Sequence, residues 1–216
     1  MDAVTRSLAR QAYDHLLANI TAGAWPPGTL LNRRSVADSL GFSVAPVLEA
    51  MVQLESEGLL ETLPRKGTRV CLSSAERQYD LWMMREAIEC QAVRLACGAP
   101  VRSAWDTLAP LAAAADGPAA VPAQRWQNEV AFHRALAVCT ASELLLREFD
   151  RYIRVGFFFA LQQTLAGVAP RGLALHVQLL KRLKQADPDS AERAMREHLW
   201  PTHQCLDSLR QHSQAR

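Results

Sequence analysis

The prolines and glycines that interrupt residues 23–71 constrain the fold more than any other feature of this chain. Pro26, Pro27 and Gly28 cannot continue a helix, so an amphipathic helix over residues 5–21 has to end before them. Downstream of this turn, glycines separate two short helical patterns, and two short strand patterns follow. The segment therefore has to fold as a small set of short elements joined by tight turns.

The two helical patterns lie close together. Val36, Ala37 and Leu40 form the apolar side of a short helix that ends at Gly41, because glycine accepts left-handed dihedral angles without a Cβ clash. Ser43 is a good N-cap for the next helix. Two helices separated by such a tight turn are typical of a helix-turn-helix.

A β-hairpin is predicted after Gly58, which closes the second helix. Residues 59–63 and 68–72 read as two short strands, and residues 64–67 form a basic tip between them. The complete order is that of a winged helix-turn-helix, a module that places its second helix in a groove of DNA. We therefore predict a DNA-binding domain over residues 1–72.

A family resemblance rests on the combination of residues in this segment. They are Pro26-Pro27-Gly28, Leu30-Leu31, Val36-Ala37, Leu40-Gly41, Ser43, Pro46-Val47, Glu49-Ala50, Leu54-Glu55, Glu57-Gly58-Leu59 and Gly67. With them, about seventy residues resemble the DNA-binding domain of the GntR family of bacterial transcription regulators. The resemblance implies that the helix after Ser43 is the recognition helix.

The recognition helix departs from the family pattern in its charge. Val44 and Leu48 occupy the positions where family members usually carry arginine, the commonest reader of guanine in the major groove. The helix contains no Lys or Arg and three glutamates. Residues 1–72 hold seven Lys or Arg and seven Asp or Glu, so we expect weak non-specific binding to DNA phosphates.

The remaining cations and polar groups predict where DNA is contacted. Arg33 and Arg34 precede the second helix, and the wing carries a basic cluster that could reach the minor groove. Val44 could contact a thymine methyl group. The alternative is that these are ordinary solvated side chains. The predicted DNA-binding residues are Arg33, Arg34, Ser43, Val44, Arg65, Lys66, Gly67 and Arg69.

The rest of the chain, residues 73–216, reads as an all-α antiparallel bundle. It shows helical spacing almost throughout and no alternating strand pattern. Proline at position 201 is expected to kink the last helix. The predicted helices cover residues 75–97, 101–115, 124–139, 142–165, 171–186 and 188–210.

Polar residues in apolar company indicate a candidate metal site in this bundle. Glu129 and His133 are four residues apart and so share one helix face, while His176 and His198 lie among leucines and methionine on two other helices. A carboxylate and three imidazoles suit a divalent transition metal. Histidines on apolar helix faces also occur as core residues without a metal, and spacing does not decide between the two.

A second resemblance extends the first. Met84-Arg85-Glu86-Ala87 with Glu89, residues 129–136 (EVAFHRAL), His176 and residues 194–199 (AMREHL) are similar to the FCD ligand-binding domain of FadR-like GntR regulators. The resemblance implies a metal bound by Glu129, His133, His176 and His198, with glutamate in place of the usual aspartate. Zinc is the first expectation, and nickel and manganese stay open. Arg85, and less directly Arg154, are expected to bind a small carboxylate effector.

Whole-chain properties agree with a cytoplasmic regulator. The 216 residues carry a net charge of +2, and no run of eighteen apolar residues or signal-peptide pattern is present, so no membrane partner is expected. The five cysteines are scattered without CxxC spacing, as in a reducing compartment.

The predicted function is that of a regulator which binds double-stranded operator DNA as a homodimer. A small organic acid bound at the metal would change the affinity of the chain for DNA. Two alternatives remain at this point. One is a metal-dependent enzyme on a helical bundle, and the other is a regulator that acts through a protein partner without reading bases itself.

Overall fold

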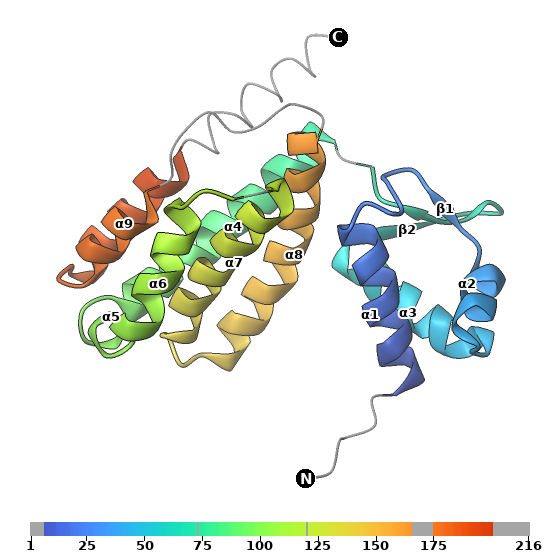
Figure 1. Cartoon of the computed structure of the whole chain (residues 1–216), viewed down its shortest axis with the longest axis horizontal. Coiled ribbons are helices and arrows are strands. Elements are labelled where there is room, and N and C mark those ends of the chain that lie inside the picture. Colours follow the sequence, from blue (N-terminus) through green and yellow to red (C-terminus); the bar gives the residue numbers. More distant parts are fainter. Residues whose placement is uncertain (1–6, 73, 120, 166–174, 201–216) are drawn as a thin grey trace. The chain divides into compact units, whose positions relative to one another are not determined.

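The computed structural model describes residues 7–72, 74–119, 121–165 and 175–200 (Figure 1). The chain divides into two compact units, Met1–Ser73 and Ser74–Arg216. The first combines helices with a small sheet, and the regular elements in the described residues of the second are all helices. The chain is thus mainly α, with a winged helix-turn-helix followed by a helical domain, as predicted.

The first unit contains three helices and three strands. They are α1 (Leu8–Thr21), β1 (Leu30–Leu31), α2 (Arg33–Leu40), α3 (Val44–Glu57), β2 (Leu60–Leu63) and β3 (Gly67–Val70). α1 packs against α3 through buried side chains that include Leu16, Ile20 and Leu54. Gly41 and Gly58 end α2 and α3 with φ of 67° and 84°, as the helix-ending glycines predict. α2 and α3 meet at an angle of 118°.

The sheet has one strand more than the predicted hairpin. The strand order is β1-β3-β2, and both pairings are antiparallel. β1 pairs Leu30 with Arg69 and Leu31 with Thr68. A strand of two residues is too short to show alternation, so the sequence pattern did not reveal it. β1 leads directly into α2, and this connection brings the start of α2 close to the wing.

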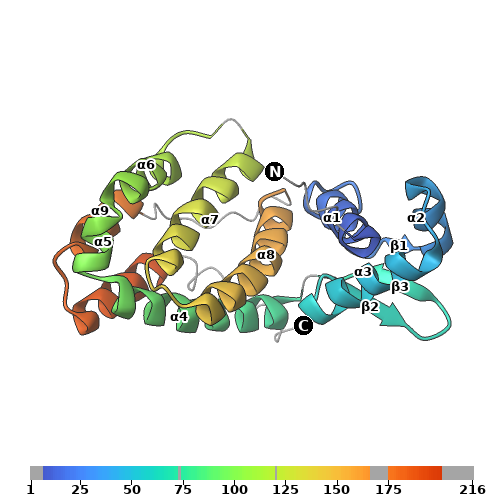
Figure 2. The same ribbon diagram turned by 90° about the horizontal axis from the view of Figure 1, so that it is seen from below.

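The second unit consists of α4 (Ala75–Ala96), α5 (Ala99–Ser103), α6 (Trp105–Asp116), α7 (Pro122–Val138), α8 (Glu143–Leu165) and α9 (His176–Leu183). Residues 188–200 are also helical. α7 lies between α6 and α8, α4 packs against α7 and α8, and α6 contacts α9 (Figure 2). The shared core includes Phe132, Leu136 and Leu183.

The predicted helix over residues 101–115 is two helices in the structure, and this prediction was wrong. α5 ends at Ser103, and Ala104 leaves the helical region with φ of −94° and ψ of 11°. Long-range hydrogen bonds to the end of α9 fix this corner. The Gly98 amide donates to the Leu183 carbonyl, and Arg102 Nη1 donates to the Lys184 carbonyl. Sequence spacing does not report such contacts.

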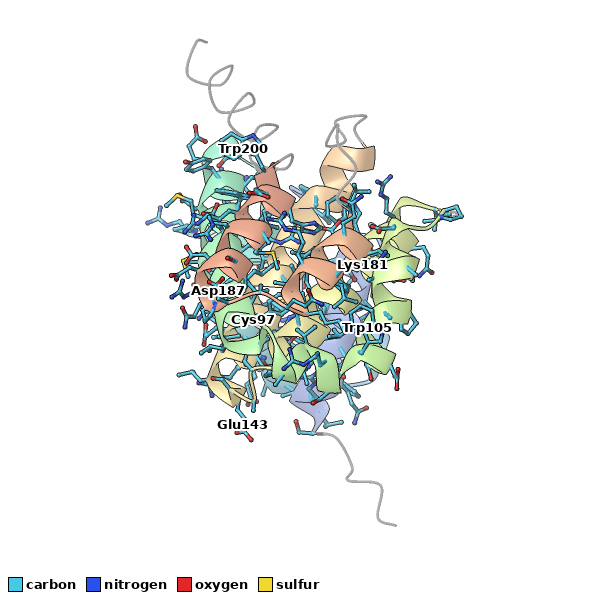
Figure 3. All side chains as sticks on the ribbon, turned by 90° about the vertical axis from the view of Figure 1, so that its left-hand side faces the viewer. Cys97, Trp105, Glu143, Lys181, Asp187 and Trp200 are labelled. Carbon is cyan, nitrogen blue, oxygen red and sulfur yellow. The ribbon has the colours of Figure 1, made fainter. Side chains whose placement is uncertain are left out.

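The last described helix is capped at its start and paired with α4 near its other end. Asp187 caps it, because Asp187 Oδ1 accepts hydrogen bonds from the amides of Asp189 and Ser190 at 3.0 Å each (Figure 3). Arg196, near its other end, pairs with Glu86 on α4. The predicted break at residues 167–170 and the predicted kink at residue 201 lie outside the described residues.

Two further observations concern the whole described chain. Within the described residues, no single helix is both long enough and apolar enough to cross a membrane. The four cysteines among them, Cys71, Cys90, Cys97 and Cys139, are free thiols.

Candidate functional site

Several predicted DNA-binding residues meet in one hollow on the winged helix. The hollow has a volume of about 590 Å³ and lies where β1, the start of α2, the start of α3 and the wing come together. Its lining is Leu30, Leu31, Asn32, Arg33, Arg34, Val44, Lys66 and Gly67. Five of the eight predicted residues therefore lie around one concave surface.

Local structure explains how the cations reach this hollow. Asn32 caps α2, because its Oδ1 accepts hydrogen bonds from the amides of Arg34 at 2.9 Å and Ser35 at 3.3 Å. The cap fixes Arg33 and Arg34 in the first turn of α2. On the wing, Arg65 has a positive φ of 66° in the turn after Pro64, an arrangement close to a type II turn. That turn places Lys66 beside the hollow.

The cations of this unit differ in their pairing. Arg33, Arg34, Arg65 and Lys66 are exposed, and none of them forms an ion pair within residues 7–72. Arg69 is different, because its Nε and Nη2 atoms bind Glu61 Oε1 at 2.9 and 2.8 Å across the two strands. Four of the five predicted cations are therefore free to bind phosphate.

The start of α3 offers a further anion-binding feature. Ser43 is exposed, occupies the N-cap and makes no side-chain capping hydrogen bond. The first amides of the helix consequently lack that partner, and a helix N-terminus favours negative charge.

The glutamates of α3 largely serve the fold of the domain itself. Glu55 accepts hydrogen bonds from the Thr62 amide at 2.6 Å and the Thr62 hydroxyl at 2.9 Å. Glu57 accepts one from the Tyr13 hydroxyl at 2.7 Å. Glu49 alone of the three is exposed. The negative charge counted from the sequence is therefore only partly presented to a ligand.

In the helical unit, three of the four predicted metal ligands come together. His133 on α7, His176 at the start of α9 and His198 on the last described helix each offer a ring nitrogen within 4.8 Å of the others. The Nε2 atoms of His133 and His198 are 3.3 Å apart. His133 and His176 are buried, with 1% and 2% of their surfaces exposed. We call these three residues the histidine cluster.

Two carboxylates hold the histidine cluster in position. Asp116, the last residue of α6, accepts hydrogen bonds from the His176 amide and the Val177 amide at 2.8 and 2.9 Å, and its Oδ1 lies 2.8 Å from His176 Nδ1. Glu89 Oε2 lies 2.5 Å from His133 Nδ1. Carboxylates that contact the Nδ1 atoms leave the Nε2 atoms facing inward as ligands.

Arg85 and the predicted ligand Glu129 lie next to this cluster and bind one another. Arg85 Nε donates to Glu89 Oε1 at 2.6 Å, and Arg85 Nη2 donates to Glu129 Oε1 at 3.0 Å. Glu129 is not one of the three groups whose ligand atoms converge, and it stays a predicted fourth ligand. Arg154, the other predicted effector residue, is half-buried on α8.

Burial and charge together set the protonation of these groups. Burial raises the pKa of Glu89, but Arg85 and His133 outweigh this effect and bring the pKa to about 2. Burial, and to a smaller extent the neighbouring imidazoles, lowers the pKa of His198 to about 2. The pKa of His176 is also lowered, mainly by burial. His176 and His198 are therefore neutral near pH 7, as metal ligands must be.

The histidine cluster fits a metal ion on two grounds. His176 Nε2 is buried and has no hydrogen-bond partner among the described residues, as expected of an atom that binds something else. Two nitrogens on one tetrahedral ion at about 2.0–2.1 Å lie roughly 3.3 Å apart, which matches the Nε2 separation of His133 and His198.

Sequence reasoning did not identify the two supporting carboxylates as part of the site. Asp116 is separated from His176 by 60 positions, so spacing along the chain does not indicate their contact. Glu89 gave a usable signal, because it lies four residues after Arg85 and so shares its helix face.

Family models match both units. Residues 8–70 match the model of the "Bacterial regulatory proteins, gntR family", and residues 80–200 match the FCD domain.

Relatives match the chain over most of its length. A probable D-xylose utilization operon transcriptional repressor of Paenarthrobacter nicotinovorans is 27% identical, over 92% of this chain and 91% of the relative. The HTH-type transcriptional repressor RspR of Escherichia coli is 24% identical, over 96% and 92%. A putative transcriptional regulator GntR from Rhodococcus shares the fold with a TM-score of 0.76 at 21% identity, over 94% of this chain and 99% of that one.

Proposed function

The chain belongs to the GntR family of bacterial regulatory proteins and carries an FCD domain, and we propose that it is a homodimeric regulator whose binding to operator DNA responds to a small organic acid. Its family and relatives are transcription regulators, so the chain is not an enzyme, and the metal-dependent enzyme considered above is excluded. The DNA-binding domain is assigned to residues 1–72 and the effector domain to residues 73–216.

The observation that carries the DNA-binding part is the hollow on the winged helix. Arg33, Arg34 and Lys66 surround it without carboxylate partners in residues 7–72, next to the start of α3. Groups of this kind bind phosphates and fix the orientation of the protein on the duplex. A homodimer would place two such units on symmetric half-sites.

For the effector part, the histidine cluster is proposed to bind a divalent transition metal, with zinc first and nickel or manganese as alternatives. His133, His176 and His198 would hold it, with Glu129 as the fourth ligand. A bound metal would supply a Lewis-acidic position for a carboxylate oxygen.

Arg85 is the proposed protein partner of the acid. Its guanidinium already binds Glu89 and Glu129, and its side chain is 13% exposed. An incoming carboxylate would therefore replace Glu129 on Arg85. Arg154 is proposed as a second contact for the acid. Such an exchange of partners would link the acid to the arrangement of α4 and α7, which carry these groups.

Selection from a random-sequence duplex library tests DNA binding. Zinc-loaded full-length protein should enrich a palindromic site at low and at physiological salt. The Arg33→Ala/Arg34→Ala/Lys66→Ala variant should lose the enrichment, because these cations contact phosphate. Arg10→Ala is the matched control, since Arg10 is an exposed arginine of the same unit that pairs with Asp14.

The effector part has its own readout. Titrating small mono- and dicarboxylic acids against the protein on its selected site should change the dissociation constant, and removal of the metal by a chelator should abolish the change. No enrichment at either salt, with folded and metal-loaded protein, would instead support a regulator that works through a protein partner. The arginine-free α3 is the observation that keeps this second candidate open.

A further inference from the structure

α3 exposes a row of apolar side chains beside the face that makes its buried core contacts. Val44, Leu48 and Val52 follow one another at intervals of four residues and are 39%, 40% and 56% exposed. We call these three residues the apolar row. Four other residues of α3 are buried and hold it to the domain, namely Val47, Ala50, Met51 and Leu54. The apolar surface of the helix is therefore wider than the part that contacts the rest of the domain.

The surroundings of the apolar row indicate what covers it. Val44, the first residue of the row, lines the same hollow as Arg33, Arg34 and Lys66. An apolar surface that continues into unpaired cations complements a ligand that has both apolar groups and phosphates. The major groove of DNA admits an α-helix, and the C5-methyl group of thymine is the apolar group that it displays.

The charged residues of α3 do not prevent the apolar row from lying in the major groove. Glu55 and Glu57 bind Thr62 and Tyr13 within the domain. Glu49 is exposed on a neighbouring face of the helix, where a carboxylate can accept a hydrogen bond from cytosine N4.

We propose that the apolar row reads the operator through the C5-methyl groups of thymine, in place of the hydrogen bonds to guanine that arginine would make. The inference rests on the proposed DNA binding and adds the chemical group that is recognised. The half-site is accordingly rich in thymine where it faces Val44, Leu48 and Val52.

Deoxyuridine provides the matched probe, because it differs from thymidine only by the missing methyl group. The duplex enriched from the random library is resynthesised with deoxyuridine at each thymine in turn, and binding of zinc-loaded full-length protein is measured. Loss of one methyl contact should weaken binding about fourfold. Replacing a critical T·A pair by C·G should weaken binding further, and 5-methylcytosine at that position should recover part of the loss.

Two variants connect the effect to the apolar row. Leu48→Ala should bind the thymine and deoxyuridine duplexes with nearly equal affinity, because the side chain that contacts the methyl group is gone. Leu8→Ala should keep the full difference, since Leu8 is 50% exposed on α1 and lies away from the hollow. Leu48 is itself exposed, so circular dichroism should show both variants folded.

The outcomes separate this inference from the function on which it rests. A thymine-specific effect that Leu48→Ala removes supports the inference. Equal binding of both duplexes by the wild-type protein overturns it and assigns the apolar row to another occupant, such as a protein partner, while DNA binding still holds. If the library yields no enriched duplex, both the proposed DNA binding and the inference fall.

Discussion

The cations around the hollow on the winged helix are unpaired in the described part of that unit, whereas the arginine next to the histidine cluster of the bundle is paired with carboxylates. Arg33, Arg34 and Lys66 are exposed and have no carboxylate partner within residues 7–72. Arg85 is largely buried, with its side chain 13% exposed, and lies between two carboxylates. Unpaired cations can bind phosphate without losing a contact inside the protein. A ligand that binds Arg85, in contrast, has to replace one of the two carboxylates that Arg85 already binds.

This difference suits two different tasks. Binding at an exposed, unpaired surface depends mainly on attraction and falls with salt. Binding at a buried, fully paired site depends on an exchange of partners, and the released carboxylate has to find a new position. Only the second kind of site links ligand binding directly to a rearrangement of the helices that carry it.

The largest effect is expected when a charge is removed from the paired residues next to the histidine cluster. Glu89→Gln should lower the free energy of unfolding of the helical unit by about 3 kcal/mol, because Arg85 and His133 lose their shared carboxylate. Tryptophan fluorescence during urea unfolding measures this, since four of the five tryptophans lie beyond residue 73. Glu76→Gln, exposed on the same helix, should change little, and equal effects of the two would contradict the comparison.

Metal binding tests the support of the histidine cluster. Asp116→Asn should weaken zinc binding about 10–100-fold, because His176 loses the carboxylate that orients its ring. Isothermal titration with a competing chelator gives the affinity. Asp187→Asn is the matched control, since Asp187 also caps a helix but contacts no imidazole. A loss of similar size in both variants would mean that capping alone matters.

Acid should destabilise the buried site selectively. The pKa of His198 is about 2 and that of His176 is also lowered, so below pH 6.5 the unfolded chain binds more protons than the folded chain. Stability is therefore full above pH 6.5 and falls as the pH drops. The free energy of unfolding of the metal-free protein should fall by about 2 kcal/mol between pH 7 and pH 5. Urea unfolding at both values checks this, and a His198→Gln variant with an undiminished dependence would refute the assignment.

On the exposed side, stability and binding should change in opposite directions at the wing. Arg65 has a positive φ of 66°, which costs energy for any side chain other than glycine or asparagine. Arg65→Gly should raise the free energy of unfolding of the winged helix by about 0.5–1 kcal/mol and weaken DNA binding. Calorimetry and DNA titration measure the two effects. Tighter DNA binding by this variant would show that Arg65 makes no phosphate contact.

The smallest effect should come from turning a paired cation into an unpaired one. Glu61→Gln releases Arg69 on the wing and should strengthen DNA binding about two- to threefold at low salt, with stability changed by less than about 1 kcal/mol. Asp14→Asn, which releases Arg10 on α1, is the control and should not strengthen binding. DNA titrations at two salt concentrations distinguish the pair.

Sequence reasoning was most successful where structure depends on neighbouring residues. Gly41 and Gly58 end their helices as predicted, because a helix end is a local property of the backbone. The break at Ala104 was missed, since hydrogen bonds to the end of α9 hold it. β1 was missed because two residues show no periodicity.

The sites follow the same division. The convergence of His133, His176 and His198 was anticipated through a family resemblance, and spacing alone left it open. The contacts of Asp116 and Glu89 with the imidazoles required coordinates, because a carboxylate next to an imidazole gives no signal in the sequence when the two are far apart in the chain. The sequence indicated only the proximity of Glu89 to Arg85, four residues away on the same helix.

The pairing of charges on the winged helix also affects how the regulator is distributed in a cell. Most of a chromosome is competing DNA without the operator, and it retains a protein through phosphate contacts alone. In the described part of this unit, Arg69 is neutralised by Glu61, and four exposed cations are left on the predicted surface. Such a surface releases few counterions on random DNA, so each encounter is brief. A small number of copies of the protein can then bind a few operators, because little of the protein stays bound to DNA that lacks the operator.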